Sequence, residues 1–290
     1  MTTPGYLAWH ASPKKPDHVL PSGACDAHCH VFGPAATFPF AASSTYEPVD
    51  ASADDLFALH RHLGIERSVI VQASCHGTDN AAMADALVRG GDAYRGVAVV
   101  ADTVTETELQ ALHDVGVRGV RFNFVKRLGG GKPLDYYKPI IDKIAALSWS
   151  VVVYLEAADL EDLAPFLRRM PVPVVIDHMG RVPVEEGTTS SSYALLASLL
   201  EDEAFWVKIS CPERLSTLGP PYSDVDAVAR GLLAHCPDRI LWGTDWPHPN
   251  MKSHMPDDGL LVDRLVSVCD NDAALLQRVL VDNPTRLYWS

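Results

Sequence analysis

Short apolar runs recur along the chain at intervals that suit strands separated by helices. Most of these runs are near-continuous stretches rich in Val and Ile rather than strict alternations of apolar and polar residues, which is typical of parallel strands covered on both faces. They occupy residues 24–30, 68–74, 96–100, 119–124, 150–156, 173–178, 205–210 and 239–245. The pattern predicts eight parallel β-strands.

Helical patterns lie between these strands. They cover residues 54–63, 79–89, 105–115, 136–147, 160–170, 193–202, 224–235 and 272–281. The third opens with Thr105 and Glu108 at the spacing of a capping box. Eight strand–helix alternations with right-handed crossovers predict an α/β protein with a (β/α)8 TIM barrel. A doubly wound sheet is the alternative fold, but no Gly-rich nucleotide-binding motif follows a strand.

The chain of 290 residues fits one such barrel. We expect residues 1–23 to form a Pro-rich N-terminal lead-in packed on the barrel, and residues 24–290 to form a single catalytic domain. The N-terminal residues lack the apolar region that a signal peptide has, so we expect none there. No apolar run is long enough to span a membrane. The six cysteines form no CxxC pair, which favours reduced thiols in a cytoplasmic protein.

The charge balance narrows the choice of partners. Lys and Arg number 24 against 37 Asp and Glu, so the net charge is −13. Nucleic acids and anionic membranes bind basic surfaces, so neither is an expected partner. The expected partner is therefore a small-molecule substrate. The sequence does not specify an oligomeric state.

Polar residues end several predicted strands, where barrels of this type carry their active sites. His28 and His30 end the first strand, and a period of two places both on one face, with Cys29 pointing away. His178 ends the sixth strand and Asp245 the eighth. A single strand-end histidine is most often structural, but convergence from three distant strands favours a functional site.

These residues resemble the pattern of the amidohydrolase superfamily. Metal-dependent members add a Lys or Glu on strand 4 and a His on strand 5, where this chain has Arg121 and Tyr154. An arginine cannot be deprotonated to coordinate a metal. We therefore expect no metal and no cofactor. A mononuclear zinc on the histidines and Asp245 is the alternative.

Longer stretches resemble one lactonase family within this superfamily. The stretches are GACDAHCHVFGP, VIVQASCHGTDN, GVRFNFVKRL, VVIDHMGR, CPERL, WGTDWPHPNM and NPTRLYWS. They resemble the metal-independent lactonases that hydrolyse 2-pyrone-4,6-dicarboxylate in the degradation of lignin-derived aromatic compounds through protocatechuate 4,5-cleavage. The resemblance implies that water opens an anionic dicarboxylate lactone, reversibly, to 4-oxalomesaconate.

The resemblance also implies roles for individual residues. Asp245 would be the general base that takes a proton from water, and His28, His30 and His178 would polarise the lactone carbonyl. The positions that match substrate-binding residues are Tyr46, Ser74, Arg121, Arg127, Tyr154, Arg214 and Asn250. The planar guanidinium groups suit carboxylates. The histidine protonation states, and which carboxylate each arginine holds, stay open.

Each arginine has a structural alternative. Arg121 could form an internal salt bridge with Glu156 or Asp177, and Arg127 and Arg214 could be solvated surface residues. Three other functions are alternatives for the whole protein. They are a zinc-dependent amidohydrolase or related decarboxylase, a lactonase for a sulfonated muconolactone, and a non-catalytic ligand-binding barrel.

Asp245 argues against the non-catalytic barrel, because a pocket that only binds a dianion has no electrostatic reason to contain a carboxylate. We expect the arginines to make the barrel mouth locally positive despite the acidic surface.

Overall fold

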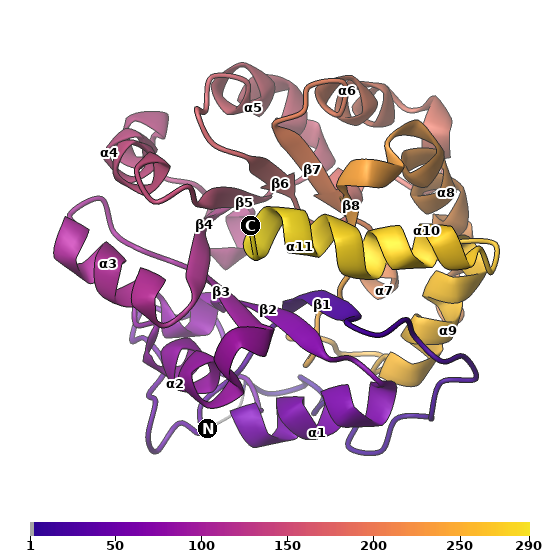
Figure 1. Cartoon of the computed structure of the whole chain (residues 1–290), viewed down its shortest axis with the longest axis horizontal. Helices are drawn as coiled ribbons and strands as arrows, with labels where there is room; N and C mark the ends of the chain where they lie inside the picture. The colour runs from indigo at the N-terminus through magenta and orange to yellow at the C-terminus, as the bar shows by residue number, and fades with distance from the viewer. Residues whose placement is uncertain (1–2) are drawn as a thin grey trace.

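A computed structural model describes residues 3–290 and shows eight strands surrounded by helices (Figure 1). The strands are β1 (Cys25–Cys29), β2 (Arg67–Val71), β3 (Tyr94–Ala98), β4 (Val117–Asn123), β5 (Ser150–Tyr154), β6 (Val174–Ile176), β7 (Phe205–Lys208) and β8 (Ile240–Leu241). Each pairs in parallel with the next along the chain. All eight predicted strands are confirmed, although most are a few residues shorter than their apolar runs.

Backbone hydrogen bonds also join the two ends of the sheet. The Ala27 N–H donates to the Trp242 carbonyl and the Asp245 N–H to the His28 carbonyl, each over 2.8 Å. Gly243 permits this approach, since a Cβ there would lie 2.4 Å from the His28 nitrogen. The fold is therefore a (β/α)8 barrel, and the doubly wound alternative is wrong.

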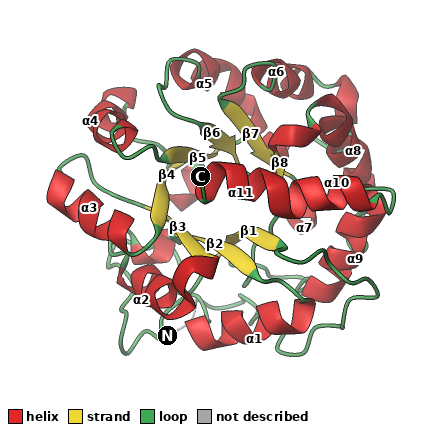
Figure 2. Cartoon of the chain, in the orientation of Figure 1, coloured by secondary structure: helices red, strands yellow, loops and turns green. Residues whose placement is uncertain are grey.

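Helices form the outer ring (Figure 2). They are α1 (Ala53–Leu63), α2 (Ala81–Gly90), α3 (Glu106–Asp114), α4 (Leu134–Ala145), α5 (Leu160–Leu167), α6 (Ser191–Leu199), α7 (Pro212–Leu215), α8 (Asp226–His235), α9 (Asp258–Val268), α10 (Ala273–Gln277) and α11 (Asn283–Tyr288). The predicted capping box at Thr105 and Glu108 opens α3 and is confirmed.

The last part of the chain departs from the prediction. Helix α9 lies where no helix was expected, and the helix expected at 272–281 is divided by a π-helical turn between α10 and α11. Gly259 in the first turn of α9 weakens the helical signal. The glycine is required there because a Cβ would lie 1.9 Å from the Lys14 carbonyl oxygen of the lead-in.

Two layers of side chains fill the barrel. The apolar layer consists of Cys25, Ala27, Val69, Val71, Val97, Val152, Val175, Trp206, Leu241 and Tyr288. Tyr288 belongs to α11, which lies across one end of the barrel (Figure 1). The inward-facing side chains two residues closer to the carboxyl ends of the strands are polar. We call these residues, together with the strand-end groups beside them, the polar layer: His28, Arg121, Tyr154, Asp177, Lys208 and Asp245.

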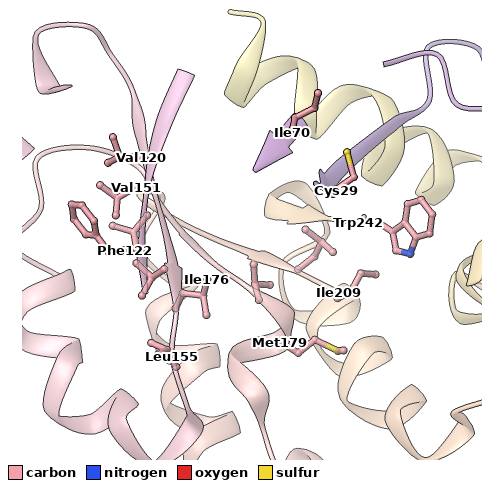
Figure 3. Packing of buried hydrophobic residues seen from close by; sticks show 14 of the residues in the cluster. Cys29, Ile70, Val120, Phe122, Val151, Leu155, Ile176, Met179, Ile209 and Trp242 are labelled. Carbon is pink, nitrogen blue, oxygen red and sulfur yellow. The ribbon is translucent and has the colours of Figure 1, made fainter. Parts of the chain in front are cut away.

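The outward faces of the strands pack against the helices. Figure 3 shows this contact, in which Cys29 of β1 lies beside Ile70 of β2. All six cysteines are buried and free. Within residues 3–290, no helix is long and apolar enough to cross a membrane.

The N-terminal lead-in contacts the loops on the polar side of the barrel. The Trp9 ring packs edge-on against Trp246, with ring centroids 5.3 Å apart. The Leu7 N–H donates to the Met251 carbonyl over 2.8 Å.

Candidate active site

A pocket opens at the carboxyl ends of the strands. It is lined by His30, Tyr46, Ala73, Ser74, Arg121, Arg127, Leu128, Tyr154, His178, Arg214, Asp245, Pro249 and Asn250. Every site residue predicted from the sequence except His28 lines this pocket. His28 is fully buried beside it, with Nε2 3.5 Å from Asp245 Oδ1. The structure therefore brings all of the predicted residues together.

A register shift in β1 turns His28 and His30 toward Asp245. Cys25 and Ala27 face the apolar layer, and pairing with β2 shifts between Asp26 and Cys29. After the shift, both His28 and His30 face Asp245. Cys29 points outward, with Sγ 3.1 Å from Ser68 Oγ, so its predicted orientation is confirmed.

Asp245 is held from both sides. Its Oδ1 lies 3.2 Å from His30 Nε2, and its Oδ2 accepts from Arg214 Nε and Nη2 over 3.1 and 3.0 Å. Burial favours a raised pKa, but Arg214, His30 and His178 outweigh burial and hold the pKa of Asp245 well below its usual value. The carboxylate is therefore ionised at neutral pH. Its backbone is left-handed, with φ of 64°.

Two of the histidines are neutral. Burial lowers the pKa of His28 to about 3 and that of His178 well below its usual value. His178 Nδ1 lies 2.8 Å from Ser210 Oγ. The Nδ1 of His30 donates to the Val71 carbonyl over 2.7 Å, which turns its Nε2 toward Asp245.

Arg121 forms the salt bridge considered as its structural alternative and also lines the pocket. Its Nη2 lies 3.3 Å from Asp177 Oδ2, so the expected salt bridge is confirmed with Asp177. Glu156, the other partner considered, pairs instead with Arg181 over 2.6 Å. The Arg121 guanidinium also lies over the Tyr154 ring at 5.2 Å and lines the pocket.

The other two arginines stand at the pocket mouth. Arg127 is exposed, and its Nη2 donates to the Tyr154 hydroxyl over 2.9 Å. Arg214, on α7, is mostly buried, so the prediction of a solvated surface position is wrong for this residue. Its Nη2 also donates to the carbonyl of Pro249, in the loop after β8, over 2.7 Å.

Lys208, a buried charged residue beside the pocket, was not among the residues predicted from the sequence. Lys208 of β7 is fully buried, with Nζ 3.0 Å from His28 Nδ1 and 3.1 Å from Asp177 Oδ1. The sequence does mark this residue, because Lys208 is the only charged residue in the apolar strand FWVK. The partners of Lys208 come from other strands, so the sequence of β7 does not identify them.

Residues 25–289 match the amidohydrolase family profile. The chain belongs to the amidohydrolase family. It is 53% identical to a 2-pyrone-4,6-dicarboxylate hydrolase of Comamonas testosteroni, over 99% of this chain and 97% of that protein. It is 38% identical to a 4-sulfomuconolactone hydrolase of Rhizobium radiobacter, over 93% of this chain and 91% of that protein.

A solved amidohydrolase structure has the same fold. It is that of a probable 2-pyrone-4,6-dicarboxylic acid hydrolase from Acinetobacter baumannii with citric acid bound. The TM-score is 0.80 at 27% identity, with 92% of this chain and 100% of that chain covered.

The side chains around His28, His178 and Asp245 disfavour a divalent metal ion at this cluster. Donor atoms of His28, His178 and Asp245 lie within 4.8 Å of one another, which is the spacing of a ligand set. Arg214 already occupies one oxygen of the carboxylate, and Lys208 faces the other nitrogen of His28. An ion between them would therefore face positive side chains and compete with an existing ion pair.

Proposed function

We propose that this amidohydrolase is a lactonase that hydrolyses 2-pyrone-4,6-dicarboxylate to 4-oxalomesaconate, reversibly, without a metal ion or cofactor. The observation that carries the proposal is a pocket lined by three arginines and one ionised carboxylate. The arginines suit a small dicarboxylate, and the carboxylate suits water activation. The 53% identity to a hydrolase of this substrate supports the same assignment. The free cysteines agree with action in the cytoplasm.

The hydrolysis needs a base, an oxyanion stabiliser and a carboxylate clamp. Asp245 takes a proton from water as the water oxygen attacks the lactone carbonyl carbon. Imidazole N–H groups of His28 and His178 donate to the carbonyl oxygen as negative charge develops on it. The ring C–O bond then breaks, and the leaving enol oxygen takes the proton that Asp245 received from water, which restores the carboxylate. The enol product is the tautomer of 4-oxalomesaconate.

Arg214 links substrate binding to base strength in this proposal. In the free protein its guanidinium neutralises Asp245, and this contact weakens the carboxylate as a base. A substrate carboxylate at the pocket mouth competes for the same guanidinium. Sharing Arg214 with the substrate would raise the pKa of Asp245 as the substrate binds.

A spectrophotometric assay tests the proposal. Purified protein should hydrolyse 2-pyrone-4,6-dicarboxylate with a higher kcat/KM than 4-sulfomuconolactone, for which two other relatives are named. The opposite preference would assign the pocket to the sulfonated lactone. Absence of turnover with both would overturn the lactonase assignment.

Metal analysis tests the remaining part of the proposal. We expect dialysis against a chelator to leave kcat unchanged and the protein to contain no stoichiometric zinc. Activity that is lost to the chelator and restored by zinc would replace this mechanism with a metal-dependent one.

A further inference from the structure

Lys208 is a buried cation that does not line the pocket. It lies on β7 with no exposed surface, and the pocket-lining residues do not include it. Its ammonium group reaches His28 Nδ1 at 3.0 Å and Asp177 Oδ1 at 3.1 Å. A buried ammonium is costly unless its protons are used in hydrogen bonds. Lys208 therefore has a role specific to these two partners.

The contact with His28 decides where the imidazole proton resides. An ammonium group has donors only, so His28 Nδ1 must accept from Lys208. Because the imidazole is neutral, its single proton then lies on Nε2. The Nε2 atom is buried and has no hydrogen-bond partner among residues 3–290. It is an unused N–H donor beside Asp245, where the reaction takes place.

The opposite tautomer fits the same atoms less well. His28 Nδ1 lies 3.1 Å from Asp177 Oδ1, so a proton on Nδ1 could be donated there. That N–H would face the Lys208 ammonium, and two donors would then point at each other in a fully buried site. Asp177 is already compensated in charge without this proton, because Lys208 and Arg121 form ion pairs with its two oxygens over 3.1 and 3.3 Å.

We infer that Lys208 is a positioning residue, which fixes the proton of His28 on Nε2 and so makes His28 a hydrogen-bond donor to the lactone carbonyl. The second half of this inference rests on the proposed function. The first half concerns the free protein and holds or fails without any substrate.

Nitrogen NMR of the histidine side chains tests the tautomer directly. In 15N-labelled protein, His28 Nε2 should give a protonated, pyrrole-type signal and Nδ1 an unprotonated, pyridine-type signal, with assignment by loss of both in His28→Gln. A protonated Nδ1 and unprotonated Nε2 in the wild-type protein would overturn the inference. This result is independent of whether 2-pyrone-4,6-dicarboxylate is the substrate.

Three variants of β7 test the consequence for catalysis. Lys208→Met keeps the side-chain length without the donor, and we expect kcat to fall by about 10²-fold with little change in KM, the scale of losing one oxyanion donor. Lys208→Gln retains an N–H donor and should recover part of kcat. Val207→Ala, on the outward face of the same strand, should leave kcat and the His28 signals unchanged.

The outcomes separate positioning from simple charge balance. Equal losses in Lys208→Met and Lys208→Gln, with His28 signals unchanged in both, would show that Lys208 only neutralises Asp177. If Lys208→Met does not fold, Lys208→Gln and the wild-type NMR measurement still decide the question. An inactive wild-type protein with the predicted tautomer would count against the proposed function alone.

Discussion

The two layers inside the barrel come from the same strands but have opposite chemistry. In β5, Val152 belongs to the apolar layer and Tyr154 lines the pocket; in β6, Val175 is apolar and Asp177 is charged. A step of two residues along a strand separates each pair. The apolar side chains need only fill space, whereas each polar group needs a partner of fixed position.

This difference separates stability from function in the molecule. Buried ion pairs contribute little net stability, since desolvation offsets their attraction. Asp177 with Lys208 and Asp245 with Arg214 are therefore poor candidates for what holds the barrel together. Substitutions in the polar layer that leave each buried charge with a hydrogen-bond partner should act mainly on turnover, whereas removing one partner of an ion pair should also destabilise the fold. Substitutions in the apolar layer should act mainly on unfolding.

The largest effect is expected for Asp245→Asn. The amide has the same shape but cannot accept a proton from water, so kcat should fall by about 10²–10⁴-fold. Steady-state kinetics measure the loss, and calorimetric titration should show that substrate binding is largely retained. The exposed Glu161→Gln on α5 is the matched charge control. A kcat near that of the wild type would overturn the assignment of Asp245 as the base.

The next effect is expected for Arg121→Met. Removing one charged hydrogen bond to a carboxylate should lower kcat/KM for the dicarboxylate by about 10–100-fold. A neutral pyrone ester should lose less, because it has no carboxylate to hold. Asp177 keeps Lys208 as a partner, so the variant should fold. Equal losses for the two substrates would assign Arg121 to structure alone.

Much of this contrast was predictable from the sequence. Valine-rich runs located the strands, and the rule that barrel active sites lie at strand ends selected His178 and Asp245. Cys29 was placed correctly because neighbouring residues on a strand face opposite ways. The sequence pattern does not show that β1 changes phase after Ala27, which depends on its pairing with β2.

The parts that were not predicted depend on contacts between distant segments. The Lys208 network joins three strands, and its partners are set by the stagger of the barrel. Helix α9 was missed because Gly259 is selected by a close contact with Lys14 rather than by helix propensity. The contact between Arg214 and Asp245 likewise joins α7, which follows β7, to the loop after β8.

Val152→Ala tests the apolar layer. Its side chain is fully buried, and removing it should lower the free energy of unfolding by about 2 kcal/mol. We expect kcat to stay within about twofold of the wild type. Urea unfolding and steady-state kinetics measure the two quantities. Tyr154→Phe, two residues along β5, should show the reverse pattern, and a tenfold loss of kcat in Val152→Ala would contradict the separation of the layers.

The smallest effect on activity is expected for Cys29→Ala, although this residue lies between the two histidines of β1. Its thiol faces Ser68 on the outer side of the barrel, and burial raises its pKa well above the usual value, so it remains a protonated thiol. We expect unchanged kcat and a loss of about 1 kcal/mol in unfolding free energy for the missing atom. Native protein should also resist iodoacetamide at this position, as mass spectrometry of the labelled peptide would show. A tenfold loss of kcat, or rapid labelling that abolishes activity, would place Cys29 in the polar layer and contradict the outward orientation.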